Sequence, residues 1–228
     1  MNKIDNIFQF FLVFVLLFLF GCNSNKKSQN MEPLVKDGMV FIKGGEFMMG
    51  GDGPDAKQDE LPKHKVLLNS FWMDESEVTN DQFQEFIDAT GYVTTAEKSI
   101  DWNEIKDMLP PGTPKPHDSL LSPSSLIFFE SKTEDLTDFT KWWKLKRNAN
   151  WKHPFGENST IKGKGNHPVI HISWDDAQEY CNWAGKRLPT EAEFEYASRG
   201  GLENNLYSWG NEPVNKGILK ANVWEGKF

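Results

Sequence analysis

Three groups of side chains in this sequence are of types that could carry chemistry, and the histidines are the first. His167 and His171 lie four residues apart, a spacing that invites a metal site. We expect residues 168–172 to form a strand, because apolar and polar side chains alternate there. Residues four apart on a strand lie about 13 Å from each other, too far to share one ion. No Cys, His or Glu pair nearby has ligand spacing, so we do not predict a zinc site.

Arg187 lies close in sequence to three glutamates, and we interpret it as one partner of a structural ion pair. The glutamates fall in the first turns of a predicted helix, where the helix dipole favours negative charge. They are Glu191, Glu193 and Glu195. The chain has no nucleophile elbow, P-loop or dinucleotide-binding fingerprint, so these residues need no catalytic explanation.

Cys181 is one of only two cysteines, the other being Cys22, so the chain has no disulfide framework of its own. It falls on the apolar side of a predicted helix, beside Ala177 and Tyr180, where a thiol is usually buried and inert. In an exported protein, however, an odd cysteine indicates a missing partner. The residues alone leave both interpretations open.

The N-terminal segment predicts export. Residues 7–20 form an apolar run of 14 residues. This is shorter than the roughly 20 that a membrane-spanning helix needs, and it is typical of a secretory signal. The Gly21-Cys22 that follows resembles a bacterial lipobox, in which the cysteine receives a diacylglycerol; an ordinary signal peptide with a chance cysteine is the alternative.

We therefore predict a lipoprotein signal peptide over residues 1–21, lipidation of Cys22, and a flexible tether over residues 22–36. Asn23, in place of Asp, favours passage to the outer membrane. The expected protein is exported and lipid-anchored, facing the periplasm, an oxidising compartment.

Composition limits the class of the remaining chain. The 228 residues are 38% hydrophobic and 25% charged, which is enough apolar material for one large folded domain. The formal net charge of −8 argues against a nucleic-acid partner, because binding phosphates needs clustered Lys and Arg. Nine Trp and 17 Phe indicate that aromatic rings carry much of the packing.

The first part of the folded body reads as strands followed by a helix. Residues 39–42 predict a strand that enters a turn at Gly44-Gly45 and returns over residues 46–49. Residues 63–73 predict a second extended stretch. Thr79-Asn80 can cap a helix that ends at Gly91, with its core positions at i, i+3 and i+4. These positions are Phe83, Phe86 and Ile87.

The middle of the chain, residues 101–165, shows little periodicity. Five prolines within residues 107–125 exclude a helix or central strand across that stretch, and such long irregular stretches are often functional. For Trp142, Trp143 and Trp151, which follow it, we favour a role as core anchors over a role in lining a substrate site.

Two helices with capping boxes are predicted between residues 167 and 201. Ser173 with Asp176 opens the first, which stops at Gly185, and Thr190 with Glu193 opens the second. We expect the linker of residues 185–189 to fold the two helices into a compact hairpin.

This region closely resembles the sulfatase-modifying factor family, the formylglycine-generating enzymes. The resemblance rests on several ordered segments that cover the chain from about residue 37 to its end, with Phe194 standing where family members commonly carry Trp. The segments are His167-Pro168-Val169-Ile170-His171-Ile172-Ser173-Trp174, Tyr180-Cys181-Asn182-Trp183-Ala184-Gly185-Lys186-Arg187-Leu188-Pro189-Thr190-Glu191-Ala192-Glu193-Phe194-Glu195-Tyr196, Arg199-Gly200-Gly201, Glu77-Val78-Thr79-Asn80, Gly91-Tyr92-Val93-Thr94, Asn150-Trp151-Lys152-His153-Pro154, Trp209-Gly210 and Ala221-Asn222-Val223-Trp224.

The resemblance implies a single, loop-rich α+β domain related to C-type lectins, over residues 37–228. It also implies an oxygen-dependent oxidase that converts the Cys of a Cys-x-Pro-x-Arg segment in an unfolded, exported sulfatase to Cα-formylglycine. Family members hold Cu(I) on two cysteines near the C-terminus, and soft thiolates suit that ion. A structural Ca²⁺ takes oxygen ligands, which map here to Asn222 and the carbonyl of Val223.

The chain ends at Phe228, before the family's copper-binding pair, its other Ca²⁺ ligands and the expected disulfide partner of Cys181. We therefore expect a domain incomplete at its C-terminus, with no catalytic residue in this chain, a partial calcium site and the copper site beyond residue 228. Two alternatives remain. One is a non-catalytic, lipid-anchored, lectin-like surface protein resembling gliding-motility lipoproteins. The other, an iron-dependent sulfoxide synthase, would need an N-terminal helical domain with His ligands that the sequence lacks.

Overall fold

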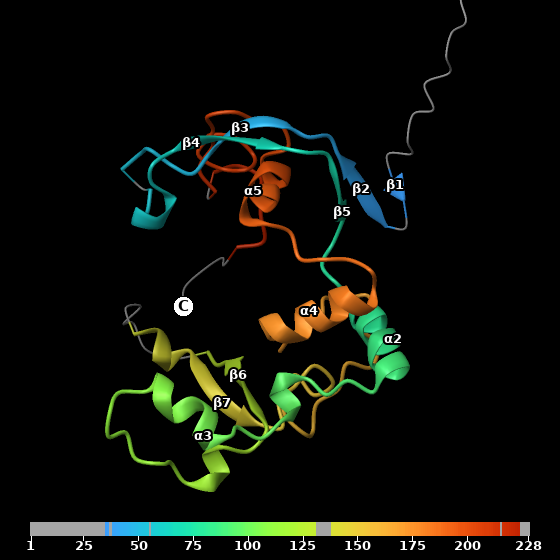
Figure 1. Cartoon of the computed structure of the whole chain (residues 1–228), viewed down its shortest axis with the longest axis vertical. Coiled ribbons are helices and arrows are strands. Elements are labelled where there is room, and N and C mark those ends of the chain that lie inside the picture. The colour runs from blue at the N-terminus through green and yellow to red at the C-terminus, as the bar shows by residue number, and fades with distance from the viewer. Residues whose placement is uncertain (1–34, 37, 55, 131–137, 215, 224–228) are drawn as a thin grey trace, which may run out of the picture. The chain divides into compact units, whose positions relative to one another are not determined.

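A computed structural model describes residues 35–223 apart from residues 37, 55, 131–137 and 215, and these described residues belong to one compact unit (Figure 1). The predicted signal peptide, Cys22 and most of the tether lie outside them. Short strands and helices alternate with long irregular segments. They are, in chain order, β1 (Val35–Lys36), β2 (Met39–Ile42), β3 (Gly45–Met49), β4 (His64–Leu68), β5 (Phe71–Asp74), α2 (Asn80–Thr90), α3 (Trp102–Ile105), β6 (Ser124–Phe128), β7 (Trp143–Arg147), α4 (Trp174–Trp183) and α5 (Glu191–Arg199).

The strands form three small antiparallel sheets, in the orders β1-β2-β5, β3-β4 and β6-β7. The register pairs Met39 with Asp74 in the first sheet and Phe47 with Val66 in the second. This mixture of small sheets and helices is the α+β fold that the sequence predicted. Among the described residues, no helix is both long enough and apolar enough to cross a bilayer.

The predicted hairpin of residues 39–49 is wrong in its pairing. β2 and β3 follow each other in the chain, yet β2 pairs with β5 and β3 pairs with β4. The chain crosses from one sheet to the other at Gly44, where an added Cβ would collide with the backbone carbonyl of Leu68. Glycine at this position therefore permits the close approach of two backbones.

The predicted strand of residues 168–172 is also wrong. The segment forms a single bridge between Pro168 and Thr79, supported by a 2.9 Å hydrogen bond from the Val169 amide to the Val78 carbonyl. The backbone then turns at His171, which adopts a left-handed conformation with φ of 61°. A left-handed residue interrupts an extended strand, and the argument about the spacing of the two histidines on a strand does not apply.

All three long helices have the predicted caps. The side chains of Thr79, Ser173 and Thr190 each accept a hydrogen bond from the third residue of their helix, in reciprocal capping boxes. Gly91 and Gly200 end α2 and α5 in the left-handed conformation. Local sequence therefore determined where these helices begin and end.

The predicted helical hairpin of α4 and α5 is not formed. In Figure 1, α4 lies beside α2, and α5 lies beside β3 and β4, in agreement with the packing contacts. The linker between the helices is long enough to let each find a different partner.

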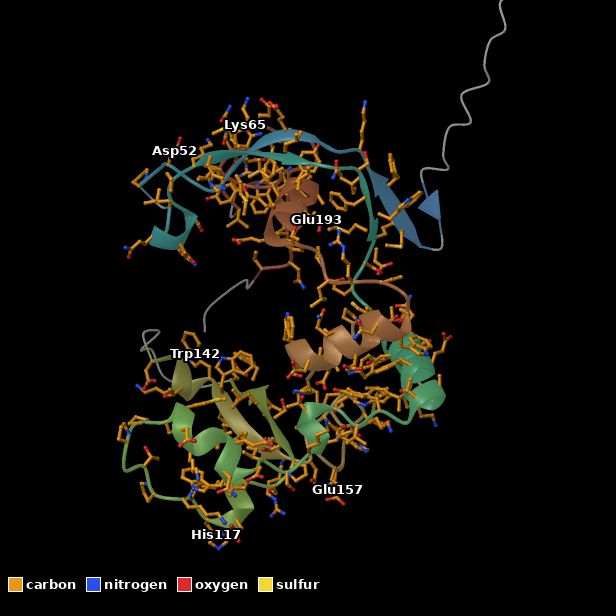
Figure 2. The ribbon with its side chains drawn as sticks, in the orientation of Figure 1. Asp52, Lys65, His117, Trp142, Glu157 and Glu193 are labelled. Carbon is orange, nitrogen blue, oxygen red and sulfur yellow. The ribbon has the colours of Figure 1, made fainter. Side chains whose placement is uncertain are left out.

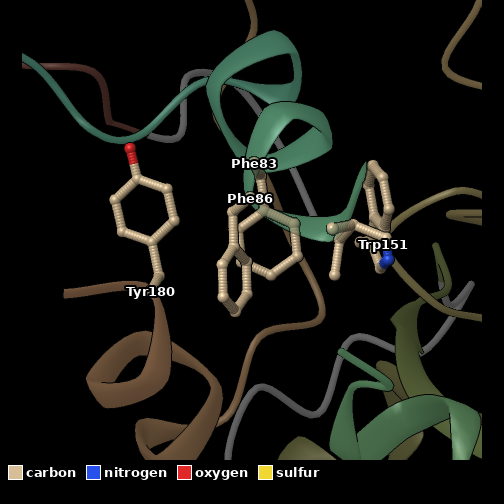
Figure 3. Packing of buried hydrophobic residues seen from close by; sticks show 5 residues of the cluster. Phe83, Phe86, Trp151 and Tyr180 are labelled. Carbon is tan, nitrogen blue, oxygen red and sulfur yellow. The ribbon is translucent and has the colours of Figure 1, made fainter. Parts of the chain in front are cut away.

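The largest group of buried apolar side chains joins α2, α4 and the irregular segment that follows β7 (Figure 3). Phe83 lies at its centre, with ring centroids 5.2 Å from Trp151 and 5.9 Å from Tyr180. Trp151 is fully buried, which confirms it as a core anchor, whereas Trp143 is 45% exposed and is not one. The group consists of Phe83, Phe86, Ile87, Trp151 and Tyr180.

Candidate functional site

A cleft of about 820 Å³ lies where α4 and the linker after it face strand β5, and it contains Cys181. The wall nearest the thiol carries an ion pair, with Lys186 Nζ 2.6 Å from Asp74 Oδ1. The sequence singled out Cys181 but did not predict this ion pair beside it. Lys186 is close to Cys181 in the chain, but Asp74 is distant from both. The remaining lining is largely apolar and includes Trp72, Met73, Val78, Leu188 and Phe194.

The Cys181 thiol is held in its protonated form. Partial burial is the main cause that raises the pKa of Cys181, the negative charge of Asp74 adds to the effect, and Lys186 opposes it. A thiol with a raised pKa is a poor nucleophile and a poor soft-metal ligand at neutral pH. Cys181 carries no disulfide within the described residues. The site thus suits a structural thiol, and pairing of Cys181 with a further cysteine stays a prediction.

The linker that forms one side of the cleft is fastened by the ion pair that the sequence predicted. Glu193 lies on α5 (Figure 2). Arg187 donates two hydrogen bonds to its carboxylate, at 2.7 and 2.6 Å, and the Thr190 amide donates a third at 2.8 Å. The carboxylate is almost fully buried. Arg187 is the main cause that lowers the pKa of Glu193 to about 2. Glu195 does not take part, because it pairs with Arg199 at 2.7 Å.

A second buried carboxylate, Asp176, joins the start of α4 to the segment that follows α2. It accepts hydrogen bonds from the Tyr92 hydroxyl at 3.0 Å, the Thr95 amide at 2.9 Å and the Ser173 amide at 2.8 Å. Burial of Tyr92 and its hydrogen bond to Asp176 raise the pKa of Tyr92 to about 12. The sequence identified Asp176 only as a capping residue. No local sequence pattern predicts its hydrogen bonds with Tyr92 and Thr95, which are distant in the chain.

The two histidines lie in different surroundings and do not form a metal site. Both ring nitrogens of His171 are engaged, Nδ1 with the Ser125 hydroxyl at 2.8 Å and Nε2 with the Pro154 carbonyl at 2.9 Å. His167 is exposed. The strand-spacing argument against a shared ion does not apply to these residues, and the expectation that they bind no zinc stays a prediction.

The described residues also provide no complete site for copper or calcium. None of their His, Cys, Asp and Glu side chains gather in groups of three or more that could hold a metal ion. Asn222 and Val223 are exposed, and together they would supply two oxygen ligands. Cys22, the predicted lipidation site, lies outside the part of the chain that the structure describes.

Comparison with known proteins shows the family. The model of the sulfatase-modifying factor enzyme 1-like domain matches residues 25–228. The chain belongs to this family. The sulfatase-modifying factor domain accounts for the α+β fold and for the motif segments around α4 and α5, as the sequence predicted.

Relatives of this sulfatase-modifying factor chain in mammals and bacteria carry the name formylglycine-generating enzyme. The mouse protein is 44% identical over 197 residues, covering 86% of this chain and 49% of the mouse protein. The protein from Thermomonospora curvata is 42% identical over 197 residues, covering 85% of this chain and 59% of that protein. The mouse protein named inactive C-alpha-formylglycine-generating enzyme 2 is 36% identical over 94% of this chain. The chain spans about half the length of the mouse formylglycine-generating enzyme it matches.

Proposed function

We propose that this chain is part of an oxidase that converts a cysteine of exported sulfatases to Cα-formylglycine. The substrate is an unfolded segment with the motif Cys-x-Pro-x-Arg, and O₂ and copper take part in the reaction. The observation that carries the proposal is the 44% identity to a formylglycine-generating enzyme over 86% of the chain. The matched region contains the two buried carboxylates described above. Glu193 accepts hydrogen bonds from Arg187, and Asp176 accepts one from Tyr92.

Copper would supply the O₂ chemistry when bound, since side chains alone do not activate O₂. The described residues do not fit this ion, because Cys181 is a single thiol with a raised pKa beside Asp74. We therefore assign no reaction step to copper here. A thiolate pair for copper would have to come from outside the described residues.

Two oxygen atoms near the end of the described residues give partial support to a calcium site. The Asn222 side chain and the Val223 carbonyl are hard oxygen donors, as Ca²⁺ requires, but six to eight ligands are typical of its sites. The other ligands are expected outside the described residues. We propose that calcium, when bound there, is a structural ion.

The location of the protein follows from the N-terminal sequence alone. The apolar residues 7–20 followed by Gly21-Cys22 support export and a diacylglycerol anchor on Cys22. We propose that the domain faces the periplasm, anchored to the outer membrane, where it meets sulfatases before they fold.

The test uses the complete gene product, incubated with copper, O₂ and a synthetic Cys-x-Pro-x-Arg peptide. We expect an aldehyde that an aminooxy probe traps and mass spectrometry locates at the peptide's cysteine. A peptide with Ser in place of Cys serves as the matched control. No aldehyde from the Cys peptide, with a copper-loaded and folded protein, would contradict the oxidase.

A non-catalytic scaffold is the second candidate, and one observation favours it. A relative named inactive keeps 36% identity across 94% of this chain, so the domain can be kept without the activity. In that case the protein is a lipid-anchored, lectin-like binding protein. In the peptide oxidation assay such a protein would produce no aldehyde.

A further inference from the structure

We draw no further inference here: the strongest candidate, the apolar face of the β6–β7 ribbon formed by Leu126, Phe128, Trp143 and Leu145, carries no proposal, because nothing in the structure shows what covers it and the chain spans about half the length of the mouse formylglycine-generating enzyme it matches.

Discussion

The guanidinium of Arg187 holds the carboxylate of Glu193 through two hydrogen bonds, at 2.7 and 2.6 Å, across the linker between α4 and α5. Glu193 is at the same time the third residue of α5, and its carboxylate accepts a hydrogen bond from the backbone amide of the capping residue, Thr190. One carboxylate therefore completes a helix cap and fastens the preceding linker. This relationship makes the stability of the domain depend on the ionisation of Glu193.

We predict that the domain loses stability at acid pH through Glu193. Its pKa is lowered from about 4.5 to about 2 in the folded protein. A group with a lowered pKa stabilises the fold above its unfolded pKa, and that contribution is lost as the pH falls from about 4.5 toward 2. Thermal melting of the complete protein between pH 6 and 2 should show a loss that Glu193→Gln diminishes.

Glu191→Gln is the matched control for that measurement, because Glu191 is an exposed glutamate in the same first turn of α5. It should leave the acid dependence unchanged. An identical acid dependence in the Glu193→Gln variant and the parent would contradict the assignment.

Tyr92→Phe should destabilise the domain by about 1 kcal/mol, the net value of a typical hydrogen bond. The hydroxyl donates to the fully buried Asp176, and its loss leaves that carboxylate with fewer donors. Urea denaturation of the complete protein measures the change. Tyr196→Phe is the control, because the Tyr196 hydroxyl donates to the Lys43 carbonyl in an exposed bond, and its effect should be smaller.

Trp151→Ala should cost about 3–5 kcal/mol of unfolding free energy, since it opens a cavity beside Phe83 in the core. Trp151→Phe should cost less, because the indole N–H is buried without a hydrogen-bond partner and only volume is lost. Trp174 is 67% exposed, and Trp174→Ala should stay within about 0.5 kcal/mol. Similar losses for Trp151→Ala and Trp174→Ala would show that the core is not where we place it.

Cys181 should react slowly with iodoacetamide at neutral pH and faster as the pH rises, because only the thiolate is nucleophilic. The reaction is followed in a reduced Cys22→Ser background, with mass spectrometry of the peptide that contains Cys181, so that alkylation of this thiol alone is measured. Asp74→Asn removes a charge that raises the pKa of Cys181, so alkylation should become faster; Lys186→Met should make it slower.

Glu77→Gln is the control for these rates, because Glu77 lines the same cleft without acting on the Cys181 pKa. Its alkylation rate should match the parent. A faster rate in the Lys186→Met variant would contradict the electrostatic account of the thiol.

Local sequence by itself determined the three long helices and their ends. Thr79, Ser173 and Thr190 cap the three long helices as predicted, because a cap needs only a side-chain oxygen and the amide three residues ahead. The motif segments around Cys181 and Arg187 likewise identified the family, which the comparisons confirmed. These features depend on residues that are near one another in the chain.

Only the tertiary structure decided which elements pair and pack. It placed β2 with β5 instead of β3, separated α4 from α5, and brought Asp74 to Lys186 and the Cys181 thiol. It also showed that Asp176 accepts hydrogen bonds from Tyr92 and Thr95, which lie in another part of the chain. Such contacts join residues far apart in sequence, and burial of the whole set of side chains selects them, so no local pattern contains them.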